Sequence, residues 1–170
     1  MTVFRRQMLA FIAAIVLMGA EGVQAEEPTK KTPPPPPATD AKPEEIVRNL
    51  YDRYFAEAYD YLDDTFRPRY FTKATAQLIG KVFAKSQKND EPGIDYEPLI
   101  DGQDGEVKGL NIVVTSQSPA KTTVEARFTS LEDKVVVSFD FVSEAGIWKI
   151  DDIRGKESSL KEISKQYLQE

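Results

Sequence analysis

The sequence predicts an α+β fold, in which N-terminal helices pack on a curved four-stranded antiparallel meander sheet and a last helix follows it. Residues 110–151 contain the four runs that predict the sheet, in which apolar and polar residues alternate. Upstream, between residues 44 and 86, apolar residues recur at the three- and four-residue spacing of helices with one buried face. Consecutive strands joined by short turns favour antiparallel pairing, and the helices would cover one face of the sheet.

The composition fits one globular domain with extensions and excludes several chemistries. The chain has 170 residues, of which 41% are hydrophobic and 29% charged, and it contains neither cysteine nor histidine. Disulfides, thiolate or imidazole metal ligands, and Ser-His or Cys-His nucleophiles are therefore absent. We expect no metal site and no cofactor. The net charge of -6 without basic clusters also makes nucleic acid an unsuitable partner.

Residues 1–25 have the pattern of a secretory signal peptide. Arg5 and Arg6 precede an apolar stretch over residues 8–18, and Val23, Gln24 and Ala25 form a small-x-small cleavage site. The apolar stretch is shorter than the ~20 residues that span a bilayer. We expect cleavage after Ala25 and release into the periplasm. The alternative is an uncleaved anchor, which would be the protein's only link to a membrane.

Residues 26–42 are predicted to be a proline-rich linker, and the folded domain is expected at 43–170. Five consecutive prolines occupy positions 33–37. Such a run cannot form helix or strand hydrogen bonds and adopts the extended polyproline II conformation. We interpret the segment as a stiff spacer. The alternative is a docking motif for a proline-recognising groove.

Three helices are expected, over residues 44–61, 72–86 and 159–168. The first carries an apolar stripe rich in tyrosine, whose hydroxyl groups need partners if they are buried. Thr72 can cap the second helix, and Ser159 with Glu162 has the spacing of a capping box at the start of the third. The acid-rich segment 89–108 is interpreted as a loop over one end of the sheet. Its acids do not match the spacing of calcium-binding loops.

Two motifs carry a resemblance to a known family. Residues 101–104 (Asp-Gly-Gln-Asp) precede the first long strand, and residues 146–153 (Gly-Ile-Trp-Lys-Ile-Asp-Asp-Ile) close the sheet. Together they resemble the bacterial secreted family known as domain of unknown function 3828 (DUF3828), within the nuclear transport factor 2-like (NTF2-like), or cystatin-like, superfamily. The resemblance covers residues 43–168 and implies a cone-shaped α+β fold and a secreted location, without an activity. Ketosteroid isomerase belongs to this superfamily, but its catalytic motif has no residue-by-residue match here.

The function that we expect is a non-catalytic binding or protein-interaction module, with an inhibitor or immunity role as one form of it. Its partner would be an unidentified protein or small molecule. The ligand pocket would lie between the first helix and the concave sheet. Its lining is predicted from aromatic and polar residues of these elements and the loop: Tyr51, Tyr54, Tyr59, Tyr96, Gln103, Phe139 and Trp148.

Two alternatives remain open from the sequence. One is a small-molecule enzyme that uses a buried carboxylate, Asp104 or Asp152, as a base with a tyrosine as hydrogen-bond donor. Against it, Asp101 and Asp104 can cap loop amides, while Asp151 and Asp152 can end the last strand. The other alternative is a structural envelope protein, in which the proline run spaces the domain from a retained anchor.

Overall fold

The computed structural model describes residues 32–58 and 60–170. The predicted signal peptide, its cleavage point after Ala25, and Tyr59 lie outside these residues. Within the described part of the chain, no helix has the length and apolar character needed to cross a membrane.

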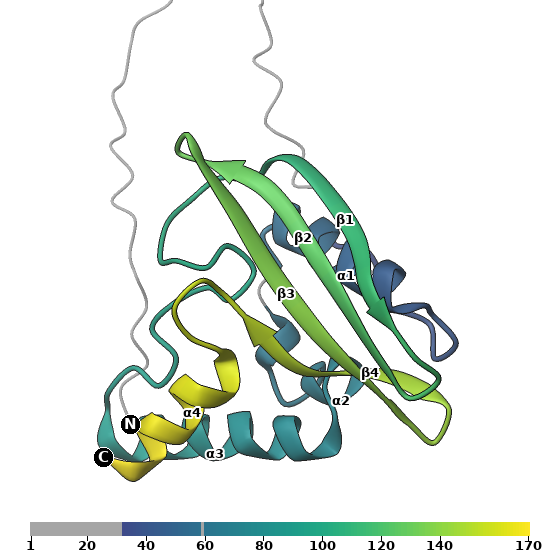
Figure 1. Ribbon diagram of the computed structural model, residues 1–170. Helices are drawn as coiled ribbons and strands as arrows, with labels where there is room; N and C mark the ends of the chain where they lie inside the picture. The colour runs from purple at the N-terminus through teal and green to yellow at the C-terminus, as the bar shows by residue number, and fades with distance from the viewer. Residues whose placement is uncertain (1–31, 59) are drawn as a thin grey trace, which may run out of the picture.

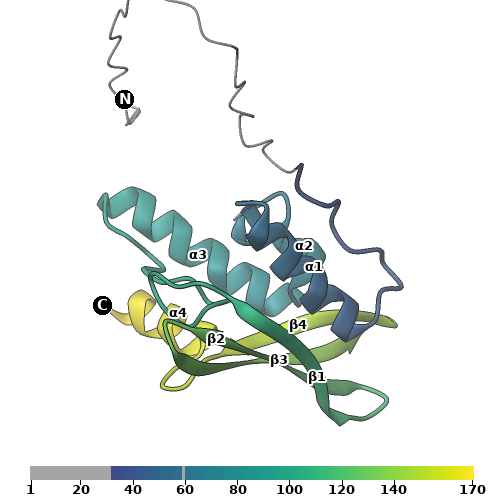
Figure 2. The same ribbon diagram turned by 90° about the horizontal axis from the view of Figure 1, so that it is seen from above.

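The predicted α+β architecture is confirmed. Helix α1 (Pro43–Phe55), a 3₁₀ turn η1 (Asp60–Leu62), α2 (Arg67–Tyr70) and α3 (Lys73–Asn89) precede the strands, and α4 (Leu160–Gln169) follows them. The strands are β1 (Lys108–Gln117), β2 (Lys121–Ser130), β3 (Asp133–Glu144) and β4 (Ile147–Arg154). They form one antiparallel sheet in the order β1-β2-β3-β4 (Figure 1). The helices α1, α2 and α3 cover one face of this sheet (Figure 2).

The core lies between α1, α3 and the inner face of the sheet. Alternate residues of β2 and β3 point into it, as the sequence predicts: Val124, Ala126 and Phe128 from β2, and Val137, Phe139 and Phe141 from β3 are all buried. From α1, Leu50 and Tyr51 are fully buried against them. Tyr51 contacts the rings of Phe128 and Phe139 edge-on, with centroids 6.0 and 6.3 Å away.

A bulge in β4 brings two isoleucines to the same face. Phe141 pairs with Ile150 and Asp140 with Asp152, so Asp151 is an extra residue on β4. Ile150 and Ile153 are consequently both buried, although they are three positions apart. Strict alternation would place one of them in solvent.

The first helix ends earlier than predicted: α1 stops at Phe55 instead of continuing to residue 61. Glu57 adopts a left-handed conformation (φ 57°), and the backbone N–H of Ala58 bonds to the carbonyl of Arg53. The buried Arg53 guanidinium pairs with Asp60 at 2.6 Å, which holds the chain in this turn. The apolar spacing in the sequence continues through this turn, but the ion pair between Arg53 and Asp60 ends the helix at Phe55.

The second helix, α3, begins as predicted and extends further. Thr72 caps it by accepting a hydrogen bond from the N–H of Thr75 (3.2 Å). The helix continues to Asn89 and ends at Asp90, which is left-handed (φ 56°). Ile79 and Val82 face the interior, in agreement with the sequence.

Short turns join the consecutive strands, as the sequence predicts. The turn of the β2–β3 hairpin consists of Leu131 and Glu132, both with positive φ (46° and 79°). The β3–β4 turn is Ala145–Gly146, also with positive φ (52° and 84°). Two successive residues with positive φ are typical of the two-residue hairpin turns whose backbone matches the right-handed twist of the strands.

The two edges of the sheet differ. Next to β4, Phe71 forms a parallel bridge with Ile150, and the N–H of Thr72 bonds to the Ile150 carbonyl at 2.9 Å. The chain between α2 and α3 therefore covers part of this edge. At the other edge, β1 is interrupted by register shifts between Lys108 and Asn111 and between Val114 and Ser116.

Candidate functional site

The tyrosines of the first helical region hold the loop over residues 90–107 against the domain. The hydroxyl of Tyr51 donates to the Leu99 carbonyl at 2.7 Å, and that of Tyr54 donates to the Gly105 carbonyl at 3.3 Å. Burial raises the pKa of Tyr51 well above its ordinary value, so this hydroxyl stays protonated. Backbone carbonyl groups of the loop are thus the hydrogen-bond partners that these hydroxyl groups require.

A third tyrosine bonds to a carboxylate beneath the same loop. Tyr61, which is fully buried, donates its hydroxyl to Glu97 Oε1, and the N–H of Leu99 also bonds to this oxygen at 3.0 Å. Burial is the main reason that the pKa of Glu97 is raised above its usual range. The enzyme alternative predicts that a desolvated carboxyl, Asp104 or Asp152, would pair with a tyrosine. Among the described residues, Glu97 with Tyr61 comes nearest to this arrangement.

An open groove runs between the 90–107 loop and α4, and we call it the α4 groove. Its first cavity, of about 510 Å³, lies between the loop and the start of α4 and includes Tyr96, Gln103 and Lys156. A second cavity of about 560 Å³ continues between α3 and the end of α4 and includes Lys85 and Tyr167. Asp95 and Ile163 line both cavities, so the two cavities adjoin at these residues.

Two of the sequence-predicted pocket residues lie in the α4 groove. Gln103 donates its amide N–H to the Asp95 carbonyl at 3.2 Å, and no described residue donates a hydrogen bond to its side-chain oxygen. The half-buried Tyr96 makes no hydrogen bond through its hydroxyl to any residue that the structure describes. Burial, and then the nearby carboxylates of Asp101 and Asp152, raise the pKa of Tyr96, which keeps its hydroxyl neutral and able to donate.

The charge of the α4 groove is negative. Carboxylates outnumber ammonium groups along its walls: Glu91, Asp95, Asp101, Glu157 and Glu170 face Lys85 and Lys156. Apolar contact area comes from Ile163 and Pro92. Such a groove favours neutral or cationic ligands with an apolar part. Among the residues described, no group of three or more acidic side chains is arranged to hold a metal ion.

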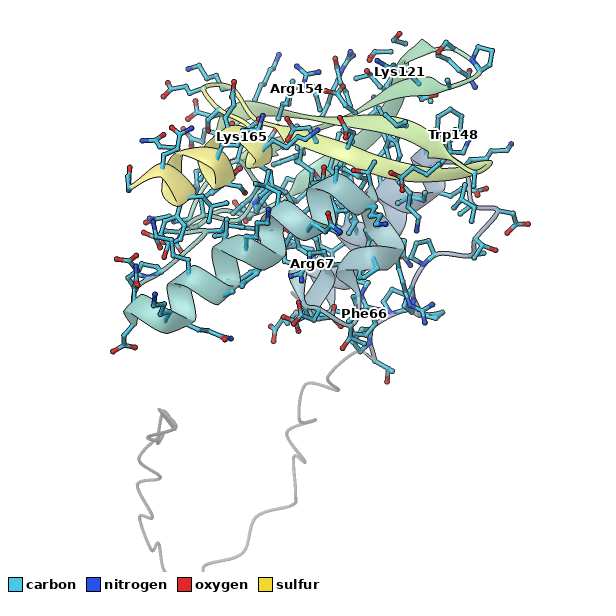
Figure 3. The ribbon with its side chains drawn as sticks, turned by 90° about the horizontal axis from the view of Figure 1, so that it is seen from below. Phe66, Arg67, Lys121, Trp148, Arg154 and Lys165 are labelled. Carbon is cyan, nitrogen blue, oxygen red and sulfur yellow. The ribbon has the colours of Figure 1, made fainter. Side chains whose placement is uncertain are left out.

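The remaining predicted pocket residues lie elsewhere. Tyr51 and Phe139 are in the closed core, and Tyr54 contacts the 90–107 loop. Trp148 is half-buried near the hairpin end of β4, at the opposite side of the view from Lys165 of α4 (Figure 3). The structure therefore brings together Tyr96 with Gln103, and Tyr51 with Phe139, and it does not gather the whole set around one cavity.

The two acids of the last strand, Asp151 and Asp152, connect β4 to the helices α3 and α4. Asp152 Oδ1 accepts hydrogen bonds from the N–H groups of Ile153 (2.9 Å) and Lys161 (3.0 Å). Asp151 pairs with the Lys161 ammonium at 2.8 Å, and its backbone carbonyl accepts the Thr75 hydroxyl at 2.7 Å. Burial raises the pKa of Asp152, while the two N–H bonds oppose the shift.

The two acids of the loop differ in their surroundings. Asp104 is exposed. Asp101 lines the α4 groove, with one carboxylate oxygen bonded to the N–H of Lys156 at 2.8 Å. Of the two candidate bases, Asp104 is therefore in solvent, and Asp152 lies on β4 with its carboxylate bonded to the first turn of α4.

Two smaller cavities lie outside the α4 groove. One of about 340 Å³ is lined by Arg67 and Phe71 beside α2, by Ala76 of α3 and by Lys149 of β4. Figure 3 shows Arg67 next to α3. Lys149 is bound to the carbonyls of Pro68 (2.9 Å) and Arg69 (2.7 Å). The other cavity, of about 430 Å³, lies between α1 and β1 beside Ile112.

Comparisons with known proteins leave the family of this chain open. No protein-family model matches it, and no curated protein matches it. Among solved structures it is similar to a phospholipid-binding protein from Ralstonia solanacearum, determined in complex with a phospholipid. The two share 16% sequence identity over 74% of this chain and 71% of that chain, with a TM-score of 0.34. A likeness at this level assigns neither a fold family nor a ligand.

Sequence reasoning missed the wall of the groove that α4 provides. The capping box of Ser159 and Glu162 correctly placed the start of this helix. Ile163 could have been recognised as an apolar residue on the helix. Its position opposite Asp95, however, depends on how the 90–107 loop and α4 pack together, for which the sequence has no local signal.

Proposed function

We propose that the protein is a non-catalytic binding module that holds a neutral or cationic ligand, a small molecule or a peptide segment, in the α4 groove. The observation that carries this proposal is that the groove is open to a ligand, whereas the acids around it are already used in structural hydrogen bonds. The groove is open, and its lining includes Gln103 and Tyr96, whose hydroxyl has no hydrogen-bond partner among the described residues. The acids Asp101 and Asp152 already accept backbone hydrogen bonds that join structural elements.

Ligand screening by NMR tests the proposal. Cationic, neutral and anionic fragments are added to the labelled protein. We expect cationic or neutral fragments to shift the amide resonances of residues 95–103 and 156–167 in a saturable way. Ile163→Trp, which fills the point where the two cavities meet, should abolish these shifts. Ile112→Trp, in the cavity between α1 and β1, is the matched control and should preserve them.

Two results would contradict this function. One is a screen in which no fragment shifts the groove resonances at millimolar concentration. The other is binding that Ile163→Trp leaves unchanged, because the ligand would then occupy a different site.

We further propose that the protein is secreted to the periplasm of a bacterium and belongs to the DUF3828 family of the NTF2-like superfamily. The pattern of residues 1–25 supports secretion, and residues 146–153 with the helices ahead of the meander support the family. Fractionation with N-terminal sequencing tests the location. A chain that begins at Glu26 in the periplasmic fraction is expected. An intact N-terminus in the membrane fraction would support the structural, anchored alternative.

A small-molecule enzyme is the second candidate, and Glu97 is the residue that favours it. Its carboxyl is largely desolvated and bonded to Tyr61, a pairing that can tune a base. None of the four cavities described above is lined by Glu97. An enzyme of this kind would lose turnover in Glu97→Gln while keeping ligand affinity, whereas the binding module would show no turnover in either form.

A further inference from the structure

The proline run, which the sequence predicts to be a stiff spacer, lies on the domain. In the structure, residues 32–42 run beside α1 in the opposite direction (Figure 2). Pro34, Pro36 and Pro37 are half-buried, whereas Pro33 and Pro35 are exposed. A polyproline II helix has three residues per turn, so Pro34 and Pro37 lie on the same face. The partial burial of Pro34, Pro36 and Pro37 shows that the segment lies against the domain, while Pro33 and Pro35 stay in solvent.

Two side chains of α1 bind consecutive carbonyl groups of the run. Asn49 donates its amide N–H to the Pro35 carbonyl at 2.8 Å, and Arg53 donates from Nη1 to the Pro34 carbonyl. Asn49 and Arg53 are four residues apart and thus lie on one side of the helix. Because proline has no N–H group, a proline run offers only acceptors to its partner, and both contacts supply donors.

Both donors are held in place by other residues. The hydroxyl of the buried Tyr70 donates to Asn49 Oδ1 at 2.7 Å, which directs the amide N–H of Asn49 toward the segment. Arg53 is 4% exposed and uses Nε and Nη2 to bind Asp60, at 2.6 to 3.2 Å. Nη1 is thereby left for the Pro34 carbonyl.

An aromatic ring completes the arrangement. The Arg53 guanidinium carbon lies 4.9 Å from the centre of the Phe66 ring, which restricts its plane. Arg53 and Asn49 are therefore oriented by residues from other elements, and the site is built independently of the segment. A preorganised site loses little conformational entropy when it binds an extended ligand.

We propose that Asn49 and Arg53 form a polyproline-binding site, that residues 33–37 are its resident ligand, and that a proline-rich peptide can replace them. The chain itself thus supplies the proline-recognising surface. The proposal is independent of the α4 groove, since the two sites share no residue. The resident segment acts as an internal competitor, because a short tether gives it an effective concentration on the order of millimolar.

Peptide binding to the whole chain tests the proposal. In one variant, residues 33–37 are replaced by a Gly-Ser segment of equal length, and a labelled peptide with the sequence of residues 32–42 is titrated into it. We expect saturable binding with amide shifts along α1, and binding at least tenfold weaker to the unaltered protein. A control peptide with its five prolines replaced by alanine should bind more weakly than the proline peptide.

Asn49→Ala in the Gly-Ser background identifies the site. We expect at least a threefold loss of affinity, while Arg48→Ala, at the neighbouring position, should leave affinity unchanged. The proposal is overturned if the proline peptide fails to bind the Gly-Ser variant at several millimolar, or if Asn49→Ala binds it as well as its parent does.

A second measurement avoids changing the proline run. The chain contains no cysteine, so Thr32→Cys allows a single spin label next to the segment. We expect a restricted label in the otherwise unaltered protein and a mobile one when Asn49→Ala is added. Equal mobility in the two proteins would show that Asn49 does not retain the segment, and would overturn the proposal.

Discussion

Asp152 on β4 and Lys161 on α4 are joined by a 3.0 Å hydrogen bond from the Lys161 N–H to the Asp152 carboxylate. The same oxygen accepts the N–H of Ile153 at 2.9 Å. One carboxylate thus ties the end of the sheet to the first turn of the last helix, where N–H groups lack partners within the helix. A negative charge is also favourable at this end of a helix.

The first prediction concerns this link. Asp152→Ala should lower the free energy of unfolding by about 1 to 2 kcal/mol, the usual range for the loss of a helix-capping side chain. Denaturant unfolding measures the change, and hydrogen exchange should rise first in α4. Asp152→Asn keeps an oxygen acceptor and should retain most of the stability. If the alanine variant had the same free energy of unfolding as the wild type, this hydrogen bond would not stabilise the fold.

The second prediction concerns the bond between Tyr51 and the loop. Tyr51→Phe removes the hydroxyl and leaves the buried Leu99 carbonyl without this donor. An unsatisfied buried acceptor costs about 1 to 3 kcal/mol. We expect a loss of stability in this range and faster hydrogen exchange in residues 95–105. Tyr54→Phe, whose 3.3 Å bond to Gly105 is longer and less buried, should cost less. The reverse order would contradict this account of the loop.

The third prediction is a pH dependence that originates at Glu97. Its pKa is raised in the folded protein, so the folded state binds this proton more tightly than the unfolded chain does. The stabilising contribution of protonated Glu97 is complete below the unfolded pKa, ordinarily about 4.3, and is lost as the pH rises through the folded value. Glu97→Gln keeps Oε1 as an acceptor and cannot ionise.

The stability of Glu97→Gln relative to the wild type should therefore rise as the pH is raised from 4 to 7. Unfolding titrations of both proteins at each pH measure this difference, and contributions from other groups, such as Asp152, cancel. A difference that stayed constant over this range would mean that the carboxyl of Glu97 titrates normally.

The fourth prediction concerns the close approach of Gly155 and Asp101. A Cβ atom added at Gly155 would lie 1.7 Å from Asp101 Oδ1, far inside van der Waals contact. Gly155→Ala should therefore destabilise the protein by about 1 to 3 kcal/mol, as overpacking does. The same substitution in an Asp101→Ala background should cost markedly less, since the obstructing carboxylate is absent. Equal costs in both backgrounds would refute the clash.

Local signals explain which parts of the fold the sequence could predict. The alternation in β2 and β3 and the capping box of α4 depend on near neighbours in the chain, and all three were correct. The predicted end of α1 was wrong because the Arg53–Asp60 pair stabilises a turn after Phe55, although the apolar pattern continues along the sequence. The β4 bulge is visible only once the pairing with β3 is known.

The candidate site was harder to predict for the same reason. Tyr96 and Gln103 were singled out for their residue types, and both line the α4 groove. The opposite wall, at Ile163, is contributed by a helix that lies far along the chain. Likewise, the tyrosine stripe of α1 looked like a pocket lining because the sequence does not reveal that a loop would supply its hydrogen-bond partners.

The unequal edges of the sheet have a consequence at high protein concentration. An exposed strand edge can pair with the edge of another molecule and start aggregation. The chain at Phe71 and Thr72 blocks part of the β4 edge, and the two register shifts in β1 interrupt the row of N–H and C=O groups that a foreign strand would need. Removing either irregularity would produce a longer regular edge, and light scattering should then show more self-association for such a variant than for the natural chain.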